Sequence, residues 1–172
     1  MTKNRLFLCK AARNRWGEAI LEYEAALALD HSSVYALSSL GWCKLYFGSI
    51  DEVIALVEQV IRLSPRDPRI ASFYNLIGTV HLLQSHTVEK ARNTSPGLPI
   101  PHSRLAAVCA LRGETERAAA ELTEARKLNG DLFSSIARLK AHPGAWLGVP
   151  KIRALYDATY FAGLRKAGMP EE

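Results

Sequence analysis

The chain has 172 residues, of which 48% are apolar and 23% are charged, with a formal net charge of +5. This length is enough for one domain with a sizeable core, and the composition is ordinary for a soluble globular protein. No run of 18 or more apolar residues occurs, so the sequence predicts no membrane span. The charge is modest and lies largely in the first residues, whereas a nucleic-acid-binding protein usually has a concentrated basic stripe. No nucleic-acid partner is therefore expected.

Residues 1–15 contain five basic side chains and no acidic one. A targeting peptide or a basic arm would have this charge, but the segment lacks a long apolar run and a small-residue cleavage site, and it continues into a helical pattern. The three cysteines, Cys9, Cys43 and Cys109, are odd in number and widely spaced. They are interpreted as buried small apolar residues in a reducing compartment, which predicts a cytoplasmic location.

The segment from Val34 to Asp67 has the pattern of two amphipathic helices joined by a tight turn. Gly48 is expected to end the first helix, because glycine readily adopts the left-handed conformation of a helix end. The run from Ser49 to Glu52 has capping-box spacing and is expected to open the second helix. Apolar residues then recur near a 3.6-residue period, which predicts one buried face.

This segment resembles the tetratricopeptide repeat, a motif of 34 residues built from two antiparallel helices. The pair Leu40-Gly41 fills the Leu-Gly position of that motif and Pro65 fills its final proline, while bulkier residues replace the usual small ones on the second helix. A small residue is expected at position 41, which is Gly41, because the paired helices approach closely there. The resemblance implies an all-α helical repeat array, an α-solenoid.

Further copies of the pattern lie on both sides. Ala19, Tyr23 and Ala26 fit the second helix of a first repeat, and Ile77-Gly78 fits the first helix of a third. The third repeat lacks six residues, and prolines 96, 99 and 101 are expected to form a stiff connector after it. Within a single domain of residues 1–172, the predicted segments are repeats at 1–33, 34–67, 71–98 (shortened) and 99–130, and a C-terminal cap at 131–172.

The cap is expected to contain two helices. Asp131 is predicted to cap the first of them, and Pro150 is predicted to open a last, continuous helix. One side of that last helix is apolar through Ile152, Tyr160 and Leu164. A one-sided helix of this kind suits the end of an array, where apolar surface would otherwise be exposed.

Several segments after residue 34, including GWCKLYFGSIDEV, LRGETERAAAELTEARKL and IRALYDATYFAGLRKAGMPEE, resemble a repeat region of rhizobial signalling proteins. In that family the region follows a class III adenylate/guanylate cyclase domain or another signalling domain. The resemblance implies a regulatory or scaffolding role. It leaves open the alternative that this chain is a detached regulatory part of such a cyclase. The catalytic residues of the cyclase domain have no matching positions here.

Catalytic and metal-binding patterns are weak. His81 and His86 are five residues apart, whereas a zinc pair on one helix favours three or four. Cys109 with His102 or His81 could imitate a nucleophile and its base, but no acidic residue stands where it would orient the histidine. The sequence therefore predicts no enzyme, no catalytic residue, no metal site and no cofactor.

The remaining candidate is a partner-binding groove on the first helices of the repeats. The resemblance places that groove at Tyr35, Ser38, Trp42, Leu45, Tyr46, Asn75, Thr79 and Leu82, with Ser72 and Leu83 beside them and Ile100, Ser103, Ala107, Ala110 and Leu111 in the fourth repeat. Exposed aromatic residues beside serine and asparagine are typical of an interaction site. The alternative is that Trp42 and Tyr46 pack against neighbouring helices. The expected function is binding of a protein or peptide partner in this groove.

Overall fold

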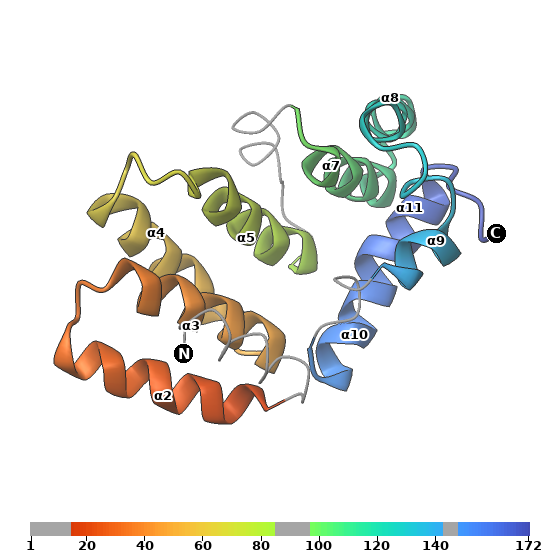
Figure 1. Ribbon diagram of the computed structural model, residues 1–172. Helices are drawn as coiled ribbons and strands as arrows, with labels where there is room; N and C mark the ends of the chain where they lie inside the picture. The colour runs from red at the N-terminus through yellow and green to blue at the C-terminus, as the bar shows by residue number, and fades with distance from the viewer. Residues whose placement is uncertain (1–14, 85–96, 143–147) are drawn as a thin grey trace. The chain divides into compact units, whose positions relative to one another are not determined.

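The computed structural model describes residues 15–84, 97–142 and 148–172, and this part of the chain is helical, without a β-strand (Figure 1). The prediction of an all-α fold is confirmed. The helical segments are α2 (Trp16–Leu29), α3 (Val34–Phe47), the 3₁₀ turn η1 (Ile50–Glu52), α4 (Val53–Leu63), α5 (Ile70–Leu83), α7 (Pro99–Arg112), α8 (Thr115–Leu128), α9 (Ile136–Ala141), α10 (Pro150–Tyr156), the π-helical segment η2 (Asp157–Phe161) and α11 (Ala162–Lys166).

The chain divides into two compact units. Unit 1 consists of residues 1–80 and 147–152, and unit 2 of residues 81–146 and 153–172, so that the boundaries fall inside α5 and α10. The predicted single domain over residues 1–172 stays a prediction. Residues 1–14 of the first predicted repeat and residues 85–96 of the shortened third repeat lie outside the described residues.

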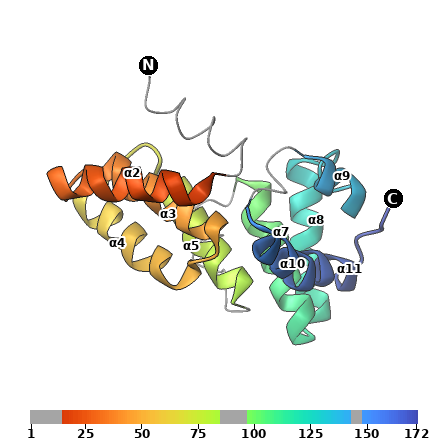
Figure 2. The same ribbon diagram turned by 90° about the horizontal axis from the view of Figure 1, so that it is seen from below.

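In unit 1, α3 packs between α2 and α4, and the three helices lie side by side in both views (Figures 1 and 2). Trp16 and Ala19 of α2 pack with Ala36, Leu40 and Cys43 of α3 in one apolar cluster. On α4 the predicted apolar face is confirmed, because Val53, Val57 and Val60 are completely buried. Ala26, the third residue of the pattern predicted for α2, is exposed.

Two local predictions in unit 1 need correction. The side chain of Ser49 makes no capping hydrogen bond, and a 3₁₀ turn at Ile50–Glu52 precedes α4 in place of the predicted capping box. A Cβ atom built on Gly41 would lie 3.4 Å from Leu76 Cδ2 and 3.5 Å from Val57 Cγ2, which is ordinary van der Waals contact. Close helix approach is therefore not what requires a glycine at position 41.

In unit 2, α7 is the central helix, with α8 on one side and η2 and α11 on the other (Figure 1). Every residue of α7 from Pro101 to Ala110 is buried. The proline connector was predicted wrongly for two of its members, since Pro99 and Pro101 lie in the first turn of α7. A proline is tolerated there because the first N–H groups of a helix have no acceptor within the helix.

The last helix begins at Pro150, as predicted, but it is not continuous. Asp157–Phe161 is π-helical, with one wide turn between α10 and α11. The wide turn shifts the buried face, so Thr159, Tyr160 and Phe161 are all buried and Phe161 joins the predicted apolar side.

The predicted cap at Asp131 is also wrong. Asp131 forms an ion pair with Arg138 at 2.9 Å, and Ser135 is the N-cap residue of α9, where its hydroxyl accepts a hydrogen bond from the Arg138 N–H. Two further N–H groups at the start of α9, those of Ile136 and Ala137, donate to the carbonyl oxygens of Pro170 and Glu171. The chain end thus supplies acceptors that the first turn of a helix lacks.

Candidate functional site

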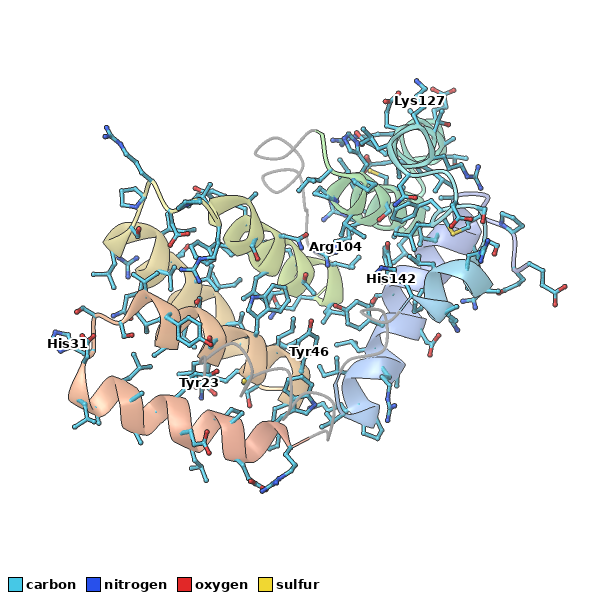
Figure 3. The ribbon with its side chains drawn as sticks, viewed as in Figure 1. Tyr23, His31, Tyr46, Arg104, Lys127 and His142 are labelled. Atoms are coloured by element: carbon cyan, nitrogen blue, oxygen red, sulfur yellow. The ribbon has the colours of Figure 1, made fainter. Side chains whose placement is uncertain are left out.

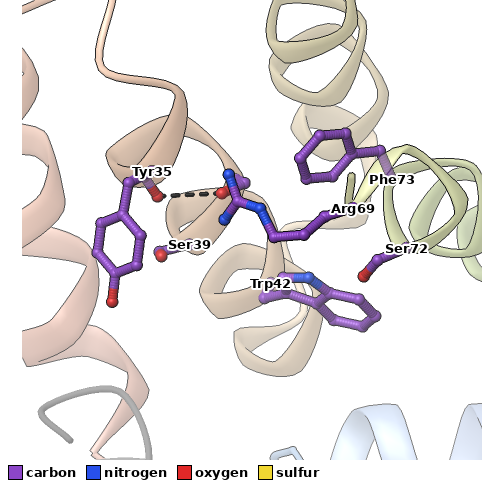
Figure 4. Close-up of a pocket in the computed structure, with 7 residues that line it drawn as sticks. Tyr35, Ser39, Trp42, Arg69, Ser72 and Phe73 are labelled. Atoms are coloured by element: carbon purple, nitrogen blue, oxygen red, sulfur yellow. Dashed lines mark hydrogen bonds between the residues drawn. The ribbon is translucent and has the colours of Figure 1, made fainter. Parts of the chain in front are cut away.

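A pocket of about 180 Å³ lies in unit 1 between α3 and the first turn of α5 (Figure 4). Helical periodicity brings the lining residues of α3 together, because residues three or four apart share one face, and that face meets the start of α5. Four of the predicted groove residues, Tyr35, Ser38, Trp42 and Ser72, line it, and three further residues complete it. The lining residues are Tyr35, Ser38, Ser39, Trp42, Arg69, Ser72 and Phe73.

Arg69 is the charged side chain in this pocket, and it is held from two sides. Its Nε and Nη2 atoms donate to the two carboxylate oxygens of Asp67 at 3.0 and 2.9 Å, and its guanidinium carbon lies 5.4 Å from the centre of the Phe73 ring. The hydrogen bonds from Arg69 lower the pKa of the Asp67 carboxyl below its usual value. In Figure 4 the Arg69 side chain runs between the rings of Phe73 and Trp42. These contacts hold the Arg69 side chain along the wall of the pocket.

The sequence left open whether Trp42 and Tyr46 belong to the groove or to the core, and their contacts in the structure differ. Trp42 lines the pocket, and its ring stacks on Tyr46 with centroids 5.8 Å apart. Tyr46 in turn lies 4.8 Å from the ring of the buried Trp16 and packs against the apolar cluster of α2 and α3. Figure 3 shows Tyr46 near the end of α3, away from Tyr23, which lies between α2 and α3. Both rings are half-buried; Trp42 lines the pocket, whereas Tyr46 packs against the apolar cluster of α2 and α3.

The other predicted groove residues do not join this pocket. Leu45, Thr79 and Leu82 are completely buried, and the hydroxyl of Thr79 donates to the carbonyl of Asn75 within α5. Asn75 is half-buried and does not line the pocket. The sequence pattern gave no indication of Arg69 or Phe73, because Arg69 precedes α5 and Phe73 lies between the groove positions Ser72 and Asn75.

In unit 2 the predicted groove face of α7 is covered by the chain itself. The hydroxyls of Ser103 and Tyr160 lie 2.6 Å apart, and Gly163 meets the backbone of Ala107. Ala110 is buried as well. The C-terminal helix therefore occupies the face that the fourth repeat was expected to present to a partner.

A second, wider pocket lies on unit 1 between α2, α3 and α4, where Lys44 forms ion pairs with Glu24 at 3.2 Å and with Glu52 at 2.8 Å. The hydrogen bond to Glu52 is the main cause that raises the pKa of Lys44. The described residues that line this pocket include no aromatic side chain, so it offers a partner less than the aromatic pocket does.

The side chains considered for catalysis lie apart from both pockets. His102 Nδ1 lies 2.6 Å from Glu121 Oε2, an interaction that joins α7 to α8 inside unit 2, so the prediction that no acidic residue orients this histidine is wrong. Among the described residues, no three His, Cys, Asp or Glu side chains gather in a way that could hold a metal ion. His86 lies outside the described residues. None of the described helices is both long enough and apolar enough to cross a membrane.

Cys43 and Cys109 are both buried, as predicted, while Cys9 lies outside the described residues. Burial, with a smaller contribution from the Glu114 carboxylate, raises the pKa of the Cys109 thiol to about 11. Since the thiolate is the reactive form, we expect about one Cys109 thiol in a thousand to be ionised at pH 8. In a Cys9→Ser/Cys43→Ala variant, a thiol reagent should label Cys109 slowly at pH 8 and rapidly in denaturant. Equally fast labelling in both conditions would contradict the burial of this thiol.

Comparison with known proteins adds no relative: no protein-family model matches the chain, and neither does any curated protein.

Proposed function

We propose that the chain is a tetratricopeptide-type repeat protein that binds a protein partner through the aromatic pocket of unit 1. The role that fits best is that of an interaction module or scaffold in a bacterial signalling protein. Two lines of observation support the proposal, one from the correspondence between two helix pairs and one from the pocket.

The pairs α3–α4 and α7–α8 correspond closely. Val34 and Pro99, which open α3 and α7, are 65 residues apart, and both helices have 14 residues. Both end on a glycine with positive φ, Gly48 at 102° and Gly113 at 84°. The same spacing relates three buried residues on α4 to three on α8. These are Val53, Val57 and Val60 on α4, and Ala118, Leu122 and Ala125 on α8.

The pocket carries the functional part of the proposal. Trp42 and Tyr35 are half-buried on the groove face of α3, and Arg69 and three serines lie next to them. Interaction sites are enriched in tryptophan, tyrosine and arginine, and such residues cost the most binding energy when truncated.

We expect Trp42→Ala to weaken partner binding by about 2 kcal/mol or more, because a central interface aromatic typically has this effect. The folded state should lose less, since Trp42 is not among the residues that pack against the apolar cluster of α2 and α3. Affinity enrichment from cell extract, followed by a titration of the purified partner, measures the loss. Leu21→Ala is the matched control, because Leu21 is exposed on α2 and does not line the pocket. Equal loss of the partner with both variants would contradict a role for the pocket.

Tyr46→Ala is expected to behave differently. Because Tyr46 packs on the buried Trp16, its truncation should lower the free energy of unfolding by about 3 kcal/mol, as removal of a packed aromatic does. Thermal and urea denaturation of the two variants separates the roles. A Tyr46→Ala protein that unfolds like the wild type but loses its partner would show that Tyr46 belongs to the binding site.

A further inference from the structure

Ser38 in the pocket and Ser103 on α7 occupy corresponding positions, 65 residues apart, and they make the same local hydrogen bond. The Ser38 hydroxyl donates to the carbonyl of Tyr35 at 3.1 Å, and the Ser103 hydroxyl donates to the carbonyl of Ile100 at 2.9 Å. In each case the serine hydroxyl donates its one hydrogen to a backbone carbonyl of its own helix. The oxygen keeps its capacity to accept a hydrogen bond from another group.

In unit 2 that acceptor is used. Tyr160 of the C-terminal helix lies with its hydroxyl 2.6 Å from Ser103 Oγ, and the tyrosine donates when the serine hydrogen is on the Ile100 carbonyl. Tyr160 is buried, and its ring lies 5.3 Å from that of Phe161. Unit 2 therefore contains an example, within the same chain, of what this serine position binds: a tyrosine presented by an amphipathic helix.

The pocket of unit 1 has the size and walls for one such side chain. Its volume of about 180 Å³ is below the roughly 300–1,000 Å³ of small-molecule sites, which favours one side chain of a larger partner over a cofactor. Trp42 and Phe73 supply aromatic walls. Trp42 stands where α7 has Ala107, the residue whose backbone Gly163 meets in unit 2. Trp42 thus adds an aromatic wall beside Ser38 that the corresponding position of α7 lacks.

We propose that the pocket binds a tyrosine side chain on a helix of the partner, whose hydroxyl donates a hydrogen bond to Ser38 Oγ. The inference rests on the proposed function and specifies the chemistry of the same site. Arg69 uses Nε and Nη2 on Asp67, so its Nη1 group can still donate a hydrogen bond to a carboxylate or carbonyl oxygen of the partner beside the tyrosine.

Two small probes that differ by one hydroxyl test the proposal. The full chain, labelled with ¹⁵N, is titrated with N-acetyl-tyrosine amide and with N-acetyl-phenylalanine amide at millimolar concentrations. Both should shift the Trp42 indole signal, and the tyrosine probe should bind about fivefold more tightly, the effect of one additional hydrogen bond. Ser38→Ala should abolish this preference and leave the phenylalanine probe unchanged. Ser134→Ala, an exposed serine in unit 2, should keep the preference.

Equal affinity of the wild-type chain for the two probes would overturn recognition of the hydroxyl, and this comparison does not depend on the folding of any variant. The absence of a Trp42 shift with either probe would overturn the pocket as an aromatic site. If a protein partner is still lost in Trp42→Ala under either result, the proposed function stands and only the tyrosine chemistry fails. If both probes bind as expected but Trp42→Ala keeps its partner, the proposed function fails instead.

Discussion

Gly163→Ala is expected to destabilise unit 2 by about 3 kcal/mol or more, at the upper end of the range for overpacking a well-packed interior. A Cβ atom at this position would lie 2.7 Å from Ala107 Cα and closer still to the Ala107 carbonyl oxygen. These are backbone atoms in the middle of α7, so they cannot rotate away as the end of a side chain can. Either α11 or α7 would have to move, and the contact between Tyr160 and Ser103 would open with them.

Gly41→Ala is the matched control, because Gly41 is also buried within a helix but a Cβ there meets only the ends of side chains, at 3.4 Å or more. Alanine is favoured over glycine inside a helix by about 1 kcal/mol, so this variant should be as stable as the wild type or slightly more stable. Urea denaturation monitored by circular dichroism gives the free energy of unfolding of both variants. Equal stability of the two variants would show that the C-terminal helix does not lie closely on α7.

The helix pairs were predictable because their signals are local. Gly48 and Gly113 end α3 and α7 in the left-handed conformation, and the sequence places each glycine directly after an apolar helical pattern. Pro150 opens α10 for a similar local reason, since a proline suits the first turn of a helix. Signals of this kind depend on a few neighbouring residues and do not require knowledge of what packs on the helix.

The features that the sequence did not indicate depend on contacts between distant segments. The small size of Gly163 matters only because Ala107, 56 residues earlier, lies against it. Asp131 has the side chain of a good cap, yet Ser135 caps α9, where the chain end supplies the neighbouring acceptors. A spacing rule contains no information about these partners.

The candidate site was predictable in part for the same reason. Tyr35, Ser38 and Trp42 share one face of α3 through helical periodicity, and that face does line a pocket. Periodicity does not tell whether a face is later covered, so the complete burial of Leu45 and Thr79 was not foreseen.

Deletion of the last four residues, Met169 to Glu172, is expected to destabilise unit 2 by about 3–5 kcal/mol. Met169 is 3% exposed and packs in the core cluster of unit 2, and loss of a buried methionine side chain costs about 2–5 kcal/mol by itself. The deletion also removes the carbonyls that accept from the N–H groups of Ile136 and Ala137, so the first turn of α9 loses two of its acceptors.

Two substitutions separate the contributions of Met169 packing and of the Glu171 charge to this loss of stability. Met169→Ala removes the packing and keeps the carbonyl acceptors, so it should account for most of the loss, and the difference from the deletion measures the acceptors. Glu171→Gln removes only the charge that pairs with Arg165 at the surface, where solvent screens the interaction, and it should change the stability little. Hydrogen exchange at Ile136 and Ala137 provides a local measurement, since both amides should lose protection in the deletion and keep most of it in Glu171→Gln. Unchanged protection in the deletion would show that α9 is held by its own packing, through Ile136 and Leu139, and not by the chain end.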